Sequence, residues 1–470
     1  MTLPIAWKRS FTLAILLLST PPPCSIPAAE NGRPEDTRPP ARRAGSSLFP
    51  HDGLPAFPGG ERLSSSSPVA PGASTAGDDP FAGQSELSLD RLVTEVERRN
   101  PSLQAMIAAW SAAAERYPQV VSLDDPMFEF MVATAHAGTN DGMGYSYQLS
   151  QAIPWPGKRQ LRGAAAAAEA DAARGEIVAT RLQLAEAART AFYQYYLACR
   201  QLEVNQRVSG LMREFRDIAQ SKYEVSQAMQ QDVLQAEVEL AELAGRRAEL
   251  VRDQRVATAR INTLLHRAVD YPLPPPPAKI QILDTLPSAE ALERQAIQSR
   301  PDLLSISSEI RAQEANLALA CKEYYPDMNF VARYDGSMGD PAMRPMVGMG
   351  VNVPLWLVKR DAAVREARDR LQQRHAEYQN RLDEVRFEVQ SALERLVQGR
   401  QIVQLYTQRI LPAAEESLKA ARANYTVGKI DFLRLLDAER QYNNQEDRYH
   451  QAVADYQTRW AELERAVGGF

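Results

Sequence analysis

IPWPGKRQLRG, at residues 153 to 163, and VPLWLVKRDAA, at residues 353 to 363, are two versions of one junction. In each, an alternating segment ends at a proline, and a long helix-favouring segment follows a Lys-Arg pair. Proline ends a strand because it lacks the amide hydrogen that a sheet ladder needs. The sequence therefore predicts two abrupt passages, each from a strand into a long helix.

The two junctions belong to an internal repeat with a period of 200 residues. Matching positions include the following pairs: Ser88 and Ser288, Leu92 and Leu292, Pro101 and Pro301, Pro126 and Pro326, Phe130 and Phe330, Pro154 and Pro354. An internal repeat sets the architecture of a chain. We expect a first repeat over 85–286 and a second over 287–470, each with a helix, a strand pair and a helical hairpin. The helices begin at Ser88 and Ser288 and end near Tyr117 and Tyr325.

Three segments, 144–153, 328–335 and 347–353, show the period of two that is typical of strands, with one apolar and one polar or small face. A fourth expected strand, 127–135, is less regular. The lengths of all four suit transmembrane strands, which need about 9–11 residues. Four strands are too few to close a barrel, and open edges are not tolerated in lipid. We therefore expect several copies of the chain to build one barrel.

The segments after the two junctions predict long coiled-coil-like hairpins. No proline occurs from Lys158 to Lys222, a length of about 98 Å as a helix. Apolar residues recur seven apart within these segments. The expected helices are 158–222 and 232–266 in the first repeat, and 359–426 and 431–467 in the second, with bends at Gly210 and Pro412. The predicted fold class is mainly α with a small β part.

The N-terminal residues predict export. Lys8 and Arg9 precede an apolar run at 11–18, which is typical of a signal peptide, and we place the signal at 1–29. Cys24 leaves open the alternative of a lipidated mature N-terminus. Residues 30–84 are rich in Pro, Gly and Ser and are expected to be disordered. No later segment has eighteen consecutive apolar residues, so no transmembrane helix is expected.

Charge and motifs argue against nucleic-acid binding and catalysis. The net charge is −5, which does not favour nucleic acid as a partner. The five histidines are scattered without metal-ligand spacing, and no nucleophile elbow or phosphate loop occurs. We expect no enzyme activity, no catalytic residue, no metal site and no cofactor.

The two junctions have the composition of a membrane boundary. Tryptophan suits a position with one apolar and one wet edge, and Lys or Arg keeps its charge outside hydrocarbon. The residues expected at this boundary are Pro154, Trp155, Lys158, Arg159, Pro354, Trp356, Lys359 and Arg360.

Together these features resemble the TolC-type outer-membrane efflux channels. The resemblance rests on the repeated order of elements, on both junctions, and on the hairpin turns YEVSQAMQQDVLQAEVEL and YTVGKIDFLRLLDAERQY. It covers residues 85 to 467. It implies a homotrimer in outer-membrane lipid, with twelve strands in one barrel and twelve helices in a periplasmic tunnel. It also implies two partners: an inner-membrane efflux pump and a periplasmic adaptor.

The resemblance further implies a gate where the hairpin turns converge. By motif position, Asp232 and Tyr425 match two gate residues, and Asp437 matches an acidic ring residue. Asp431 is a further carboxylate nearby, and Lys429 lies near a family arginine. Arg434 departs from the family, which often has an acid there. A carboxylate ring at a narrow neck would attract cations. The alternative is that Asp232 and Asp431 only begin helices.

The substrate is left open by the sequence. The PWPGKR junction resembles the heavy-metal efflux branch, which favours metal ions over drugs or a type I secreted protein. Eight of the twelve methionines lie in or beside the predicted strands, and thioethers bind soft metals. Those methionines are Met127, Met131, Met143, Met328, Met338, Met343, Met346 and Met349; they equally suit an apolar, lipid-facing role. The alternative of another class is a structural periplasmic coiled coil.

Overall fold

The computed structural model describes residue 81 and residues 83–133, 144–226, 229–282, 286–336 and 340–469. The chain divides into two units, Met1–Asp78 and Asp79–Phe470, and every described residue belongs to the second. The expected signal peptide and Cys24 lie outside the described residues. Packing begins earlier than the expected boundary at residue 85. Phe81 is only 2% exposed, because its ring packs into the helical core and lies beneath the Arg267 guanidinium.

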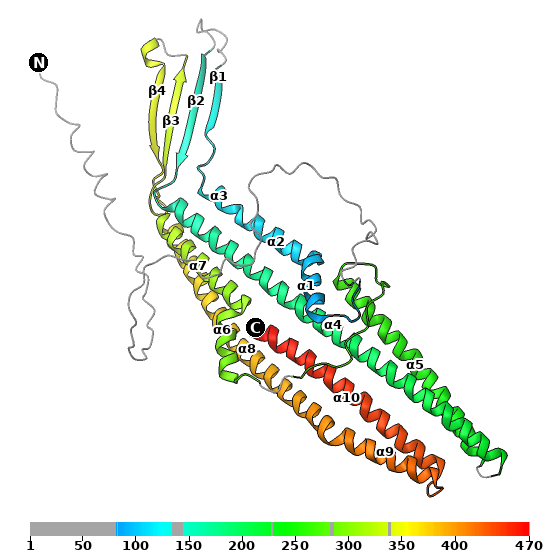
Figure 1. Ribbon diagram of the computed structural model, residues 1–470. Coiled ribbons are helices and arrows are strands. Elements are labelled where there is room, and N and C mark those ends of the chain that lie inside the picture. Colours follow the sequence, from blue (N-terminus) through cyan, green and yellow to red (C-terminus); the bar gives the residue numbers. More distant parts are fainter. Residues whose placement is uncertain are drawn as a thin grey trace, which may run out of the picture. The chain divides into compact units, whose positions relative to one another are not determined.

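Both repeats follow the order of helices, a strand pair and a long helical hairpin (Figure 1). The first repeat comprises α1 (Leu89–Arg99), α2 (Pro101–Ala114), α3 (Arg116–Val121), β1 (Met127–Ala133), β2 (Gly144–Ile153), α4 (Lys158–Glu224) and α5 (Gln230–Leu264). The second comprises α6 (Ala289–Ser299), α7 (Pro301–Lys322), β3 (Met328–Asp335), β4 (Pro345–Val351), α8 (Leu357–Leu405), α9 (Leu411–Thr426) and α10 (Phe432–Val467). Helix α3 has no counterpart in the second repeat, and the hairpin helix that matches α4 is divided into α8 and α9. The predicted class, mainly helical with a small sheet, is confirmed.

The first helix of each repeat is broken, where the sequence had predicted a single helix. Asn100 and Arg300 adopt extended backbone angles immediately before Pro101 and Pro301. A residue before proline is pushed away from the helical region, while proline itself fits the first turn of the next helix. The helix starts were predicted correctly, since Ser88 and Ser288 precede α1 and α6.

The long hairpin helices form where they were predicted. Helix α4 is 67 residues long and continues through Gly210 without interruption. In the second repeat, a π-helical turn at Tyr406–Ile410 separates α8 from α9 just before Pro412. Proline lacks the N–H that would continue the α-helical ladder, which accounts for the irregular turn. None of the helices in the described ranges has the length and hydropathy of a membrane span.

The strands form one antiparallel sheet in the order β1-β2-β3-β4. Strands β2 and β3 match the predicted segments 144–153 and 328–335, and β4 begins two residues earlier than predicted. The pairing of β2 with β3 joins the two repeats, while β1 and β4 form the edges of the sheet. One chain therefore supplies a continuous four-stranded ribbon with two open edges.

The helical hairpins of the two repeats pack on each other along α4 and α10. Helix α4 also contacts α5 and α7, and α8 contacts α7 and α10 (Figure 1). The predicted heptad positions contribute to this core: Ala191 and Ala198 in α4, and Leu435, Tyr456 and Leu463 in α10, are all buried. The sheet thus connects to the first residues of α4 and α8, and the hairpin turns follow the last residues of α4 and α9.

Candidate functional site

The two faces of the sheet differ in chemistry. The strand register places Glu129 opposite Gln148, and Gln148 opposite Arg333, in one row on the polar face. The Gln148 amide donates to Glu129 Oε2 at 3.3 Å, and Arg333 Nη2 donates to Asp335 Oδ2 at 3.0 Å. Arg333 Nε is buried without a hydrogen-bond partner in the described structure. This face therefore carries an acidic and a basic side chain in the same row across the strands.

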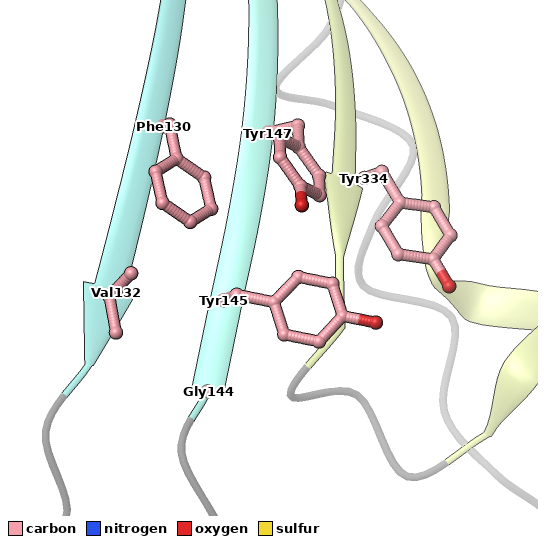
Figure 2. A pocket seen from close by; sticks show the side chains of 6 residues that line it. All are labelled: Phe130, Val132, Gly144, Tyr145, Tyr147 and Tyr334. Carbon is pink, nitrogen blue, oxygen red and sulfur yellow. The ribbon is translucent and has the colours of Figure 1, made fainter.

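The opposite face is a band of aromatic and aliphatic side chains (Figure 2). The rings of Phe130 and Tyr147 stack with centroids 5.0 Å apart, and Tyr145 stacks on Tyr334. These rings line an open hollow of about 400 Å³. They are exposed, at 53% for Phe130 and 42% for Tyr147, whereas Ser146 on the polar face is 6% exposed. Within β2 the apolar side chains are therefore the more exposed ones, whereas on the edge strand β1 the polar face is also open, with Met127 57% and Met131 45% exposed.

The first junction is held by an ion cluster at the start of β3. Lys158, the first residue of α4, is 1% exposed. Its Nζ lies 2.9 Å from Asp327 Oδ1 and 3.4 Å from Glu323 Oε2, and it donates to the Tyr325 carbonyl at 3.1 Å. The Trp155 ring stacks on Tyr325 with centroids 5.4 Å apart. The junction after β2 is thus seated against the residues that lead into β3.

Asp327 is the anionic centre of this cluster. Burial by itself would raise the pKa of its carboxyl. The Trp155 backbone N–H, which donates at 2.8 Å, and the Lys158 ammonium outweigh burial and lower that pKa. Asp327 therefore stays ionised and balances the buried lysine. The Lys158 charge, which the sequence placed at a membrane boundary, is paired with carboxylates of the same chain, and the boundary itself stays a prediction.

The other boundary residues of the first junction are also tied to the protein. Arg159 Nε donates to the Val121 carbonyl at 2.6 Å, which holds α4 against the end of α3. Gly157 precedes α4 with φ of +91°, and a Cβ there would lie 2.6 Å from Lys322 Nζ. Pro154 is half-buried. The positive φ of Gly157 is what favours glycine at this turn, because other residues rarely adopt it, whereas Lys322 Nζ is the end of a flexible side chain.

The second junction has the same residue types, but its side chains are mostly exposed to solvent. Trp356 is 80% exposed, and Lys359 is also exposed. Arg360 lies 4.0 Å from Glu323, the same carboxylate that faces Lys158. Pro354 is half-buried. The two junctions therefore differ in solvent exposure, although their sequences correspond.

At the opposite end of the long helices, the structure brings Asp232 and Tyr425 together. Asp232 lies in the first turn of α5, and Tyr425 lies near the end of α9. Burial raises the pKa of Tyr425, and the nearby Asp232 carboxylate raises it further. The Lys222 ammonium lies 4.4 Å from the centre of the Tyr425 ring. The two hairpins thus meet at the pair that the family resemblance implied.

A small hydrophobic core supports this meeting point, and we call it the turn cluster. It comprises Met212, Ala236, Phe432 and Leu436, with Phe215, Leu240, Leu243 and Tyr425 packed against it. Its residues come from α4, α5, α9 and α10. The cluster therefore ties both hairpins together close to their turns.

The remaining gate candidates lie on the surface around the second turn. Asp431 precedes α10 and accepts from the Arg434 backbone N–H at 3.1 Å, so it has the capping role that the sequence left as an alternative. The Lys429 backbone N–H donates to the Asn424 carbonyl at 2.9 Å. The side chains of Lys429, Arg434 and Asp437 are exposed. Within one chain these residues do not converge on a single point.

Two buried glutamates near the turns were missed by the sequence reasoning. Glu239 on α5 is 6% exposed and accepts from Arg440 Nε on α10 at 2.7 Å. Glu439 on α10 is 1% exposed and accepts twice from Arg422 Nη2, at 3.0 Å each. The two glutamates stand 200 residues apart, so the repeat period itself was a signal that could have found them.

Three comparisons place the chain among known proteins. Residues 292–469 match the family described as Outer membrane efflux protein. The cobalt-zinc-cadmium resistance protein CzcC of Cupriavidus metallidurans is 28% identical over 165 residues. That match spans 34% of this chain and 38% of CzcC, so it covers less than half of the relative.

The fold is similar to that of solved outer-membrane channels. For OprN the TM-score is 0.70 with 19% identity, covering 81% of this chain and 90% of that one. For CusC the TM-score is 0.70 with 17% identity, covering 87% and 99%. At such identities the similarity establishes the fold, and it extends over both repeats, whereas the family match lies in the second. The second repeat is therefore similar to the outer membrane efflux protein family, and the fold of both repeats is that of solved outer-membrane channels.

Proposed function

We propose that three copies of this chain form an outer-membrane channel that passes substrate from the periplasm to the outside. The observation that carries the proposal is the sheet, which has an exposed aromatic and aliphatic face and an opposite face with polar and charged side chains. In a membrane, the aromatic face would meet lipid and the row of Glu129, Gln148 and Arg333 would line water. The proposal is a transport role, since the family consists of efflux proteins and not of enzymes.

The need for several copies follows from the edges of the sheet. Strands β1 and β4 each present one side of their backbone without a neighbouring strand in this sheet. Unpaired backbone groups are too costly in hydrocarbon, so the edges must meet those of other copies. Three copies, as the family resemblance implies, would give twelve strands in one closed wall. The long helices would then continue the path as a tunnel in the periplasm.

The tunnel would be gated where the hairpin turns meet. Asp232, Tyr425 and the turn cluster support a closed arrangement, because they join the hairpins of the two repeats. Asp431, Asp437, Lys429 and Arg434 are exposed around the second turn, where neighbouring copies would bring them together. Arg434 would offset the carboxylates, so the entrance would be less cation-selective than a purely acidic ring.

The partners would be an inner-membrane efflux pump and a periplasmic adaptor, as in a tripartite efflux system. A channel in the outer membrane has no energy source of its own, so directional export needs a pump elsewhere. Co-purification of the tagged chain from native membranes, followed by mass spectrometry, would test this part. Recovery of the chain alone after mild cross-linking would count against it.

The substrate class that we favour is heavy-metal ions. CzcC, to which the chain is similar, is named for resistance to cobalt, zinc and cadmium. The strand register places Met127, Met131 and Met346 on the polar face, not on the apolar face that a lipid-facing role requires. Met328 and Met349 do lie on the apolar face. Thioethers beside the water-filled path would suit soft metal ions.

A deletion strain would separate the substrate alternatives. Growth would be measured with copper, zinc, cobalt and cadmium salts and with a panel of antibiotics and detergents. Loss of metal resistance alone supports the favoured class, whereas loss of antibiotic resistance or of a secreted protein supports multidrug efflux or type I secretion. A structural periplasmic coiled coil, the alternative of another class, predicts that the purified protein gives no conductance in a planar lipid bilayer.

A further inference from the structure

We propose that the second junction, residues 355–360, docks onto the residues that precede β1 of a second copy of this chain, where Lys359 pairs with Asp124 and Asp125. This inference rests on the proposed multi-chain channel. It goes beyond that function by naming the contact that aligns neighbouring copies.

The first junction supplies the template for this contact. After β2 the chain turns at Trp155 and enters α4 at Lys158, and both residues rest on the segment before β3, the next strand of the sheet. Trp155 stacks on Tyr325, and Lys158 is buried against Asp327. The first junction therefore has a seat, which consists of the Tyr325 ring and the Asp327 carboxylate just before β3.

The second junction has no such seat within its own chain. Strand β4 is an edge of the sheet, so no following strand lies beside it. The side chains that would fill the seat are exposed: 76% for Leu355, 80% for Trp356 and 79% for Val358. A contiguous exposed apolar strip of this kind marks an interaction site.

The matching seat lies at the other edge of the sheet. The segment before β1 contains Leu123, which is 40% exposed, followed by the exposed Asp124 and Asp125. In the repeat it corresponds to the segment before β3, where Asp327 binds Lys158. Pairing of β4 with β1 of another copy would bring the junction and the seat together.

Charge and apolar area both favour a second copy as the occupant. Lys359 and Arg360 are cationic, and the seat carries two carboxylates. Burial of the apolar strip would supply affinity, while the ion pair would fix the alignment of the two strands. A lipid headgroup layer could also cover Trp356, and the experiments below treat that as the competing result.

Charge reversal tests the pairing in the full-length protein in detergent. We expect Lys359→Glu, and separately Asp124→Lys with Asp125→Lys, to increase the monomer fraction severalfold in native mass spectrometry. The variant that combines all three changes should regain most of the oligomer. Lys279→Glu, at an exposed lysine in the linker between the repeats, is the control and should leave the oligomer unchanged.

Photo-cross-linking tests the seat directly. With p-benzoyl-phenylalanine in place of Trp356, we expect chain-to-chain adducts that map to residues 121–127. Adducts to lipid alone, or no rescue by the combined charge reversal, would overturn the docking. These outcomes distinguish the docking contact from the proposed function. If the wild-type protein is a monomer without conductance, the proposed function is wrong. If the protein forms a conducting oligomer that Lys359→Glu does not change, only the docking contact is wrong.

Discussion

Arg440 and Glu239 join the helical hairpins of the two repeats. Arg440 Nε on α10 lies 2.7 Å from Glu239 Oε2 on α5, and Arg440 also lies 3.6 Å from Glu242. The Glu239 side chain is 8% exposed, so its charge needs a partner inside the protein. The pair sits one helical turn from the turn cluster residues Ala236 and Leu436, and we interpret both as one latch that keeps the hairpins together.

Removal of the arginine should weaken this latch. Arg440→Gln leaves Glu239 buried without its cation, and we expect a loss of about 1–3 kcal/mol in the free energy of unfolding. If the latch holds the entrance closed, single-channel conductance should also rise. Urea unfolding followed by circular dichroism, and conductance in planar bilayers, measure the two effects.

An exposed pair on the same helix is the matched control. Arg252 and Asp253 on α5 are adjacent in the chain, and their side chains are 67% and 46% exposed. Arg252→Gln should leave the free energy of unfolding essentially unchanged, because exposed ion pairs contribute little. Equal effects of the two glutamine variants would contradict the latch.

Tyr425→Phe tests the hydroxyl that faces Asp232. Phenylalanine keeps the ring that packs on Phe432 and under Lys222, so only the hydroxyl near the carboxylate is lost. We expect the closed state to loosen and the single-channel conductance to rise. Tyr223→Phe, at a 41% exposed tyrosine beside the first turn, should have no such effect. An unchanged conductance in Tyr425→Phe would remove this residue from the gate.

Elements with a local signal were predictable from the sequence. The period of two gave β2 and β3 with their observed ends, because alternation is visible in the residues themselves. The long stretch without proline predicted a helix over 158–222, and the observed α4 ends two residues later, at Glu224. The break before Pro301 was missed, although the rule that a residue before proline avoids the helical region was available in the sequence.

Contacts between the repeats were harder to predict, because they depend on packing across long distances in the chain. Lys158 can be buried because it pairs with Asp327, which lies 169 residues away in the sequence. The residues of the junction alone do not predict this partner. Asp232 and Tyr425 were paired through family resemblance. The Glu239–Arg440 pair spans 201 residues, and it becomes visible only once α5 and α10 are placed side by side.

Asp447 on α10 should make the stability of the helical region depend on pH. Burial raises the pKa of its carboxyl to about 6, although Arg246 opposes the shift, and its Oδ1 has no hydrogen-bond partner in the described structure. The folded protein therefore binds a proton more tightly than the unfolded chain. Stability should fall as the pH rises from about 4 to about 6, because the buried carboxyl must then ionise.

Asp447→Asn removes that ionisation and should stabilise the protein at neutral pH. At pH 7.5 we expect the free energy of unfolding to increase by on the order of 1–2 kcal/mol, allowing for partial exposure, and the difference should shrink at pH 4. Glu446 and Arg207 also face this carboxyl and are unchanged in the variant. Asp217→Asn, at an exposed position on α4, is the control. A gain that is the same at both pH values would contradict a titrating Asp447.

Glu129 and Arg333 should set the charge selectivity of the channel where the strands line it. They lie on β1 and β3 with Gln148 between them on β2, about 10 Å apart from strand spacing. Asp335 on the same face pairs with Arg333, so Glu129, Asp335 and Arg333 together leave one net negative charge per chain in the wild-type wall. We expect Glu129→Gln to shift the permeability ratio of K⁺ to Cl⁻ toward anions by about twofold, and Arg333→Gln to shift it toward cations by a similar factor. Reversal potentials across a KCl gradient measure both ratios.

The variant with both changes is the control for this balance. It removes one charge of each sign from the same row, so its permeability ratio should return close to the wild-type value while its conductance stays similar. Loss of folding would reduce channel number but would not shift the reversal potential in opposite directions for the two single variants. If both single variants keep the wild-type ratio, the polar face does not line the path, and the ions are selected at the carboxylates around the hairpin turns.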